Sequence, residues 1–128
     1  MLKDSEFIGL YFGAHFAPPC RLFTTVLTKF YDQVKEDGSK FEVVFVSFDG
    51  NNDAFERNFA LMPWTAVSYA QSENIEALKQ RYGANKVPML VILDNEGNLI
   101  SYEGRQEIVN NSTEAFKLWQ EVKDKAQH

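Results

Sequence analysis

The sequence predicts an α/β protein in which a mixed central β-sheet carries helices on both faces. Residues 7–12 (FIGLYF) and 43–48 (VVFVSF) are nearly continuous apolar runs, which are typical of strands buried on both faces. A long amphipathic segment separates these two runs. A turn at residues 94–97, between two further apolar runs, predicts an antiparallel hairpin. We therefore expect the element order β-α-β-α-α-β-β-α.

The segment between the first two strands is predicted to be a helix, because its apolar residues recur every four positions. Two adjacent stripes are expected to face the core: Leu22, Val26, Phe30 and Val34 in one, and Phe23, Leu27 and Tyr31 in the other. The helix should begin at Pro18 or Pro19, since proline is tolerated in a first turn, and end near Gly38. This crossover makes the two flanking strands parallel.

The second half of the chain is expected to hold three more helices and the hairpin. The apolar residues that mark these helices are Phe55, Phe59 and Met62, then Ile75, Leu78 and Tyr82, and finally Ala115, Trp119 and Val122. Gly83 closes the second of the three, and Asn111 or Ser112 can cap the last. Residues 89–93 (MLVIL) are predicted to form a buried strand, with residues 99–102 as its antiparallel partner.

Composition excludes several classes of function. The chain has 128 residues, of which 45% are hydrophobic, so we expect one well-filled core and a single domain over residues 1–128. The net charge is -5 and no stripe of Lys and Arg is present, which makes nucleic acid a poor candidate partner. No apolar run approaches the ~20 residues needed to cross a bilayer, so membrane insertion is not expected. No metal-ligand spacing and no glycine-rich phosphate loop occur, so neither a metal nor a cofactor is expected.

Cys20 is the only cysteine in the chain. Together with the lack of a signal peptide, this usage fits the cytoplasm or another reducing compartment. In a Cys-x-x-Cys pair at a helix start, the exposed first thiol attacks a substrate disulfide and the second thiol resolves the intermediate. Here Ala17 holds the first position and Cys20 the second. A shielded thiol in the first helical turn is unreactive, which favours a buried small residue over a redox role.

Several motifs occur in one order along the chain: YFGAHFAPPCRLFT at residues 11–24, then VVFVSFD, MPW at 62–64, VP at 87–88 and GR at 104–105. This series resembles the tryparedoxin and nucleoredoxin branch of the thioredoxin superfamily, whose thioredoxin fold has the element order predicted above. That family carries Trp-Cys-Pro-Pro-Cys where this chain has FAPPC. The family's N-terminal extension is mostly lacking, so we expect either a longer parent protein or an exposed sheet edge.

The resemblance implies a binding groove around this motif. Val87-Pro88 occupies the place of the superfamily's cis-proline, where the preceding residue can pair its backbone groups with an extended segment. Trp64 is implied as an apolar wall, against the alternative of a core aromatic, and Arg105 as a donor to anionic or peptide ligands, against that of a solvated arginine. The expected binding residues are Phe16, Ala17, Pro18, Pro19, Trp64, Val87, Pro88 and Arg105. His15 has no visible orienting group, so we do not expect it to be catalytic.

These features favour a thioredoxin-like domain that has lost dithiol turnover and acts as a redox-inactive protein-binding or structural module. The expected partner is a protein or peptide segment beside Pro88, and the module could be a subunit of a larger assembly. Two alternatives stay open. One is a thiol-disulfide oxidoreductase captured as an Ala17 variant, although a change at Phe16 would serve no purpose in such a variant. The other is a protein that forms mixed disulfides through Cys20.

Overall fold

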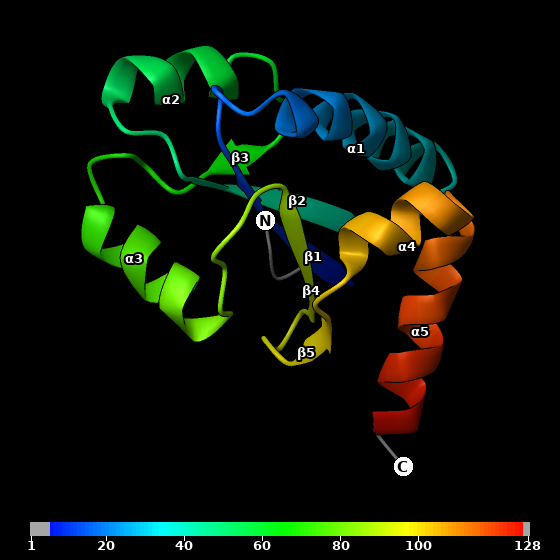
Figure 1. The fold of residues 1–128 in the computed structure, drawn as a ribbon. Coiled ribbons are helices and arrows are strands. Elements are labelled where there is room, and N and C mark those ends of the chain that lie inside the picture. Colours follow the sequence, from blue (N-terminus) through cyan, green and yellow to red (C-terminus); the bar gives the residue numbers. More distant parts are fainter. Residues whose placement is uncertain (1–5, 127–128) are drawn as a thin grey trace.

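A computed structural model describes residues 6–126, and these residues form one five-stranded sheet in the order β3-β2-β1-β4-β5 (Figure 1). The strands are β1 (Phe7–Gly13), β2 (Phe41–Ser47), β3 (Thr65–Ala66), β4 (Met89–Asp94) and β5 (Leu99–Ser101). The central strand β1 runs parallel to β2 and antiparallel to β4, while β4 and β5 form the predicted hairpin. The sheet is therefore mixed, as the sequence predicts.

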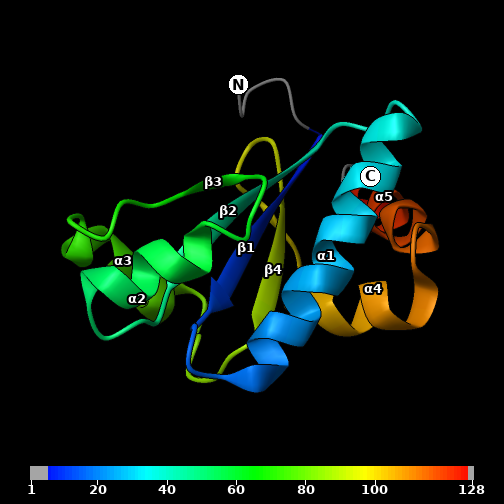
Figure 2. The ribbon, with the colours of Figure 1, turned by 90° about the horizontal axis from the view of Figure 1, so that it is seen from above.

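Helices lie on both sides of this sheet. They are α1 (Pro18–Glu36), α2 (Asn52–Phe59), α3 (Ser72–Arg81), α4 (Gly104–Asn111) and α5 (Glu114–Ala126). Helices α1, α4 and α5 lie on one side of the sheet, and α3 lies on the other (Figure 2). In the core on the first side, the Trp119 ring packs against the rings of Phe7 and Phe30. No helix within the described residues is long and apolar enough to span a membrane.

Helix α1 begins and ends where the sequence predicts. Pro18 and Pro19 occupy its first turn, and Gly38 follows its end with φ at +82°, a conformation that favours glycine. One part of the predicted inner face is wrong, because Leu22 is 73% exposed and Val26 is also exposed. At 3.6 residues per turn, Leu22 points about 140° away from the buried Leu27, which places it on the outer side of the helix.

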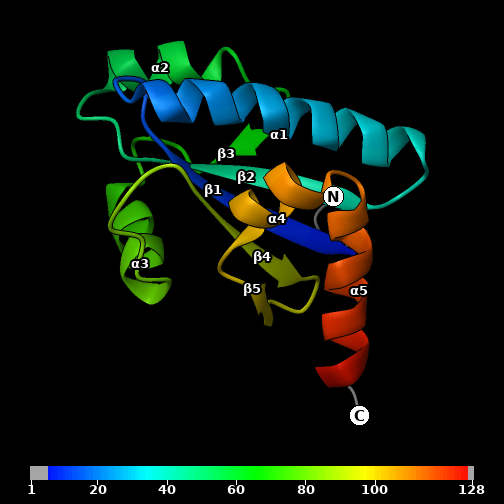
Figure 3. The same cartoon turned by 45° about the vertical axis from the view of Figure 1, so that its right-hand side comes forward.

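The structure contains two elements that the predicted order lacks. Strand β3 is one of them, since its two residues are too short to show a periodic pattern. The other is α4, which precedes α5 and crosses close to α1 (Figure 3). The chain breaks between these helices at Ser112, where φ is +51°. Ser112 therefore ends α4, and the predicted last helix follows it as α5, which begins at Glu114; Val122 on α5 is exposed, contrary to the prediction.

Candidate functional site

In the FAPPC motif, Ala17 and Cys20 occupy the two positions of a Cys-x-x-Cys pair, and they lie in different environments. Ala17 is the extended N-cap residue of α1, and its carbonyl oxygen accepts the backbone N–H of Cys20 at 2.9 Å. Phe16 is 71% exposed, and Pro18 and Pro19 are exposed beside it. Cys20 is only 1% exposed. Ala17 itself is half-buried, so an attacking thiol at this position would be partly accessible, whereas the thiol that this chain retains is enclosed.

Burial also controls the chemistry of the Cys20 thiol. Loss of solvation raises the pKa of Cys20 above its usual range, and the carboxylate of Asp49 raises it further. The backbone N–H of Ala14 and the positive charge of Arg105 act in the opposite direction. Because the thiolate is the reactive form, a buried thiol with a raised pKa is a poor nucleophile at neutral pH.

Two hydroxyl groups, those of Tyr11 and Thr24, lie beneath the first turn of α1. The Tyr11 hydroxyl lies 2.8 Å from the Cys20 carbonyl oxygen and 2.7 Å from the Thr24 hydroxyl, which itself donates to the same carbonyl at 2.9 Å. Burial raises the pKa of Tyr11, so its phenol remains protonated and neutral. These bonds hold the first turn of α1 against β1 and provide no base that could take a proton from Cys20.

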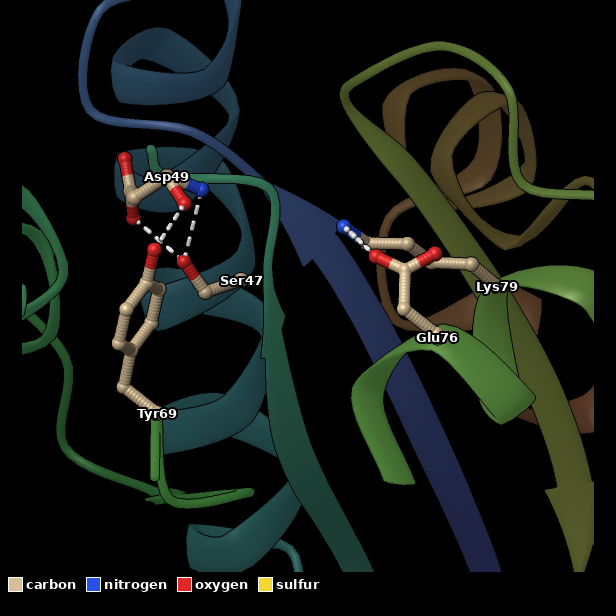
Figure 4. A network of polar contacts seen from close by, with 5 residues as sticks. All are labelled: Ser47, Asp49, Tyr69, Glu76 and Lys79. Carbon is tan, nitrogen blue, oxygen red and sulfur yellow. Dashed lines mark hydrogen bonds and ion pairs between the residues drawn. The ribbon is translucent and has the colours of Figure 1, made fainter. Parts of the chain in front are cut away.

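Asp49 anchors the loop that leads into the motif, a role that the sequence reasoning missed. Its buried carboxylate accepts the backbone N–H of His15 at 2.6 Å and the hydroxyl of Ser47 at 2.7 Å. Tyr69 donates to the backbone carbonyl of Asp49 at 2.9 Å (Figure 4). An acidic residue directly after a buried strand was the available signal, because functional groups gather at the carboxyl ends of strands in α/β sheets.

His15 contributes its backbone N–H to this anchor, and its side chain makes no such contact. The Nδ1 atom of its ring is buried and has no hydrogen-bond partner within residues 6–126. Among residues 6–126, no hydrogen bond orients this ring toward Cys20. The described residues also contain no cluster of three or more His, Cys, Asp or Glu side chains that could hold a metal ion.

A hollow of about 310 Å³ lies beside Pro88, and we call it the α4-side hollow. Its lining includes Lys86, Val87, Pro88, Tyr102 and Arg105. The Val87-Pro88 peptide bond is cis, as the resemblance implies. The backbone of Val87 forms no hydrogen bond to other backbone groups within the described residues, so its N–H and C=O remain available. Among the residues that the structure describes, neither Lys86 nor Arg105 forms an ion pair.

Close packing at Gly104 fixes the position of Arg105, which is the next residue of α4. A Cβ atom at position 104 would lie 2.9 Å from the Cδ1 atom of Ile92 and 3.0 Å from the Cδ2 atom of Leu90. The first turn of α4 can therefore approach β4 closely only because residue 104 lacks a side chain. This approach places Arg105 on the same side of the molecule as Pro88.

Of the predicted site residues, Val87, Pro88 and Arg105 line one hollow, while Phe16 to Pro19 form the loop at the start of α1. Trp64 does not join them at the surface. It is 4% exposed, and its ring packs against Tyr31 and Tyr11 with centroid distances of 5.5 and 6.3 Å. Trp64 therefore belongs to the core, the alternative that the sequence left open, and we omit it from the groove.

A strand, a helix that begins at the degenerate motif and a proline loop beside it together define a thioredoxin-like protein. The thioredoxin-like family model matches residues 5–99. Nucleoredoxin from Danio rerio is 44% identical over 108 residues, which are 84% of this chain and 26% of that protein. The chain thus spans about a quarter of the length of the nucleoredoxins that it matches.

Among solved structures, the chain is similar to tryparedoxins. Tryparedoxin I from Crithidia fasciculata shares 36% identity with a TM-score of 0.81, covering 87% of this chain and 77% of that one. A tryparedoxin II solved in complex with glutathionylspermidine shares 28% identity with the same TM-score, covering 88% of this chain and 78% of its own. The chain belongs to the tryparedoxin and nucleoredoxin branch of the thioredoxin superfamily.

Proposed function

We propose that this thioredoxin-like chain is a redox-inactive binding module that holds an extended protein segment beside Pro88. The observation that carries this proposal is the contrast between the two halves of the site. The only thiol, Cys20, is buried, while the α4-side hollow has room for a ligand and its Arg105 has no ion-pair partner among the described residues. Binding of a segment requires the α4-side hollow and does not require the Cys20 thiol.

Binding would proceed by strand addition. The free N–H and C=O of Val87 offer two hydrogen bonds to the backbone of an extended segment. Arg105 supplies charged donors at one side of this segment, and the exposed ring of Phe16 supplies an apolar contact. Because these contacts need no thiol, they would persist in a chain that has alanine at position 17.

Dithiol turnover is not expected from this arrangement. Reduction of a disulfide takes two electrons, which an enzyme with two thiols supplies by closing its own disulfide. With Cys20 alone the first attack would end at a mixed disulfide, and a second thiol from solution would have to complete the reaction. We therefore expect no catalysis of insulin reduction above the rate of the added dithiol, and measurable catalysis would contradict this view.

We also propose in which kind of protein and in which cellular compartment this module occurs. The chain spans about a quarter of the nucleoredoxins that it matches, which supports a role as one domain or subunit of a larger assembly. We propose that residues 1–128 form that single domain. A reducing intracellular compartment would suit a protein whose one thiol is enclosed.

The test is capture of partners from a cell lysate under reducing conditions on immobilised wild-type, Phe16→Ala and Cys20→Ser proteins. Each captured partner is identified and its affinity is then measured with purified proteins. Phe16→Ala should weaken binding by about 1–3 kcal/mol, since exposed aromatics at the centre of an interface typically contribute this much. Val122→Ala on α5 is the matched control, because Val122 is an exposed apolar residue away from the hollow.

Cys20→Ser should bind as tightly as the wild type. Partners that vanish with Cys20→Ser but persist with Phe16→Ala would replace the binding-module proposal with a mixed-disulfide role. Equal loss with Phe16→Ala and Val122→Ala would show that the captured proteins do not bind at the groove.

A further inference from the structure

A groove that the proposed function does not use runs along the outer side of α1. Figure 3 shows this helix on the outside of the molecule. A hollow of about 380 Å³ lies between α1 and Leu61, which is 59% exposed, and we call it the α1 groove. Its other lining residues all belong to α1: Arg21, Thr24, Thr25, Thr28, Lys29 and Asp32. None of them lines the α4-side hollow.

Four of the lining residues form a straight stripe on α1. At 3.6 residues per turn, their side chains project within about 60° of one another; they are Arg21, Thr25, Thr28 and Asp32. Arg21 lies near the start of the helix, and Asp32 lies about 16 Å further along its axis. The stripe therefore has a cation at one end, a carboxylate at the other and uncharged side chains between them.

Neither charge at the ends of the stripe is compensated within the chain. Arg21 and Asp32 are both exposed, and they lie too far apart to form an ion pair with each other. Among residues 6–126, neither of them takes part in an ion pair, although Lys29 lies only three residues from Asp32. Both charges are therefore available to another molecule.

The stripe is complementary to a second copy of itself. If two α1 helices lie antiparallel about a twofold axis midway between Arg21 and Asp32, each Arg21 faces Asp32 of the partner subunit. The same axis places Thr25 opposite Thr28 of the partner subunit. A parallel pair would instead place like charges opposite each other, which is unfavourable. The order of the charges thus selects the antiparallel arrangement.

We propose that two copies of this chain associate through the α1 groove as an antiparallel, twofold-symmetric dimer. The middle of the stripe can be covered at little cost. Thr25 donates to the Arg21 carbonyl at 3.4 Å, and Thr28 donates to the Thr24 carbonyl at 2.8 Å. Because these hydroxyl groups already have acceptors within α1, their burial leaves no donor unsatisfied.

Leu61 supplies an apolar contact beside the ion pairs. A twofold axis perpendicular to both helices leaves each side of the stripe on the same side in the two copies. Leu61 of both subunits therefore lies on one side of the axis, where the two side chains cover the α1 groove together. Burial of these exposed side chains favours association, while the pairs of Arg21 with Asp32 fix the orientation.

The dimer is tested by sedimentation equilibrium of the purified chain under reducing conditions. A contact through one helix face buries less than ~1,200 Å² in total, which is typical of weak association, so we expect a dissociation constant of about 100 µM. Loading concentrations from about 10 µM to about 1 mM cover this range. Raised salt should shift the equilibrium toward the monomer, because the ion pairs are near the surface.

Charge-reversal variants identify the paired residues. Arg21→Asp and Asp32→Arg each replace both ion pairs with like-charge contacts, so each alone should raise the dissociation constant at least tenfold. An equal mixture of the two variants should dimerise as the wild type does, because one carries only aspartates at these positions and the other only arginines.

The apolar contact and the controls complete the set of variants. Leu61→Ser should weaken the dimer, whereas Leu99→Ser on β5 is its matched control, since Leu99 is also exposed. Arg81→Asp on α3 is the control for Arg21→Asp, because it makes the same change of charge on the other side of the sheet. Thermal unfolding confirms that each variant remains folded.

The outcomes are independent of the proposed function, which makes no use of the α1 groove. A wild-type chain that stays monomeric at about 1 mM would overturn the dimer. Dimerisation that Arg21→Asp leaves unchanged, or a mixture of the two variants that stays monomeric, would also overturn it, because the contact would then lie elsewhere. The proposed function itself fails or stands in the capture experiment with Phe16→Ala.

Discussion

Substitution of Gly104 by alanine tests the close approach of α4 to β4. The added Cβ would lie 2.9 Å from two side-chain carbons of Ile92 and 3.0 Å from Leu90, well inside ordinary contact. Both neighbours are fully buried, so they can give way only by disturbing the core. Such overpacking costs about 1–3 kcal/mol, and the stiffer unfolded chain offsets about 0.4–1 kcal/mol of it. We expect Gly104→Ala to lower the free energy of unfolding by about 1–2 kcal/mol.

Urea unfolding followed by tryptophan fluorescence measures this loss, since Trp64 and Trp119 are both buried. Gly50→Ala is the matched control, because nothing lies within 4 Å of a Cβ atom there and its backbone has no positive φ. In the double variant with Ile92→Val, removal of Cδ1 should recover part of the loss as a favourable coupling energy. If Gly104→Ala were as stable as Gly50→Ala, the packing argument for the position of Arg105 would be wrong.

Three further predictions concern the motif and the core. Ala17→Cys should form a disulfide with Cys20 in a glutathione buffer, because the two positions lie one helical turn apart, and thiol counting and mass measure it. Trp64→Ala should lower the free energy of unfolding by about 3–5 kcal/mol, since its ring fills the core beside Tyr11; a smaller loss in urea would place it nearer the surface. The raised pKa of Cys20 means that the unfolded chain releases the thiol proton first, so the contribution of Cys20 to stability should be constant below pH 9.0 and be lost as the pH rises above it; Cys20→Ser should show a shallower fall in unfolding series across this range.

Much of the fold follows from local patterns in the sequence. Strands β1 and β2 are continuous apolar runs, and Gly38, Gly83 and Gly97 all have positive φ at the turns where the sequence places them. The start of α1 follows from its prolines in the same way. These features depend on residues that are close together in the chain, which is why periodicity and turn chemistry suffice to predict them.

The remaining features depend on tertiary contacts that no local pattern records. Leu22 and Leu27 are equally apolar, and only the way α1 packs on the sheet makes one exposed and the other buried. Trp64 lies in the core because Tyr11 and Tyr31, from distant segments, surround it. Asp49 anchors the motif loop across 34 residues of sequence, a distance over which spacing rules carry no information.

The lengths of the strands have a consequence for self-association. The edge strands β3 and β5 contain two and three residues, whereas the central strand β1 contains seven. A strand from a neighbouring molecule would gain few ladder hydrogen bonds by adding to either edge, and very short edge strands are one means by which proteins resist aggregation through their sheets. The chain can therefore keep the backbone of Val87 open for a partner without also offering a long template on which copies of itself could stack.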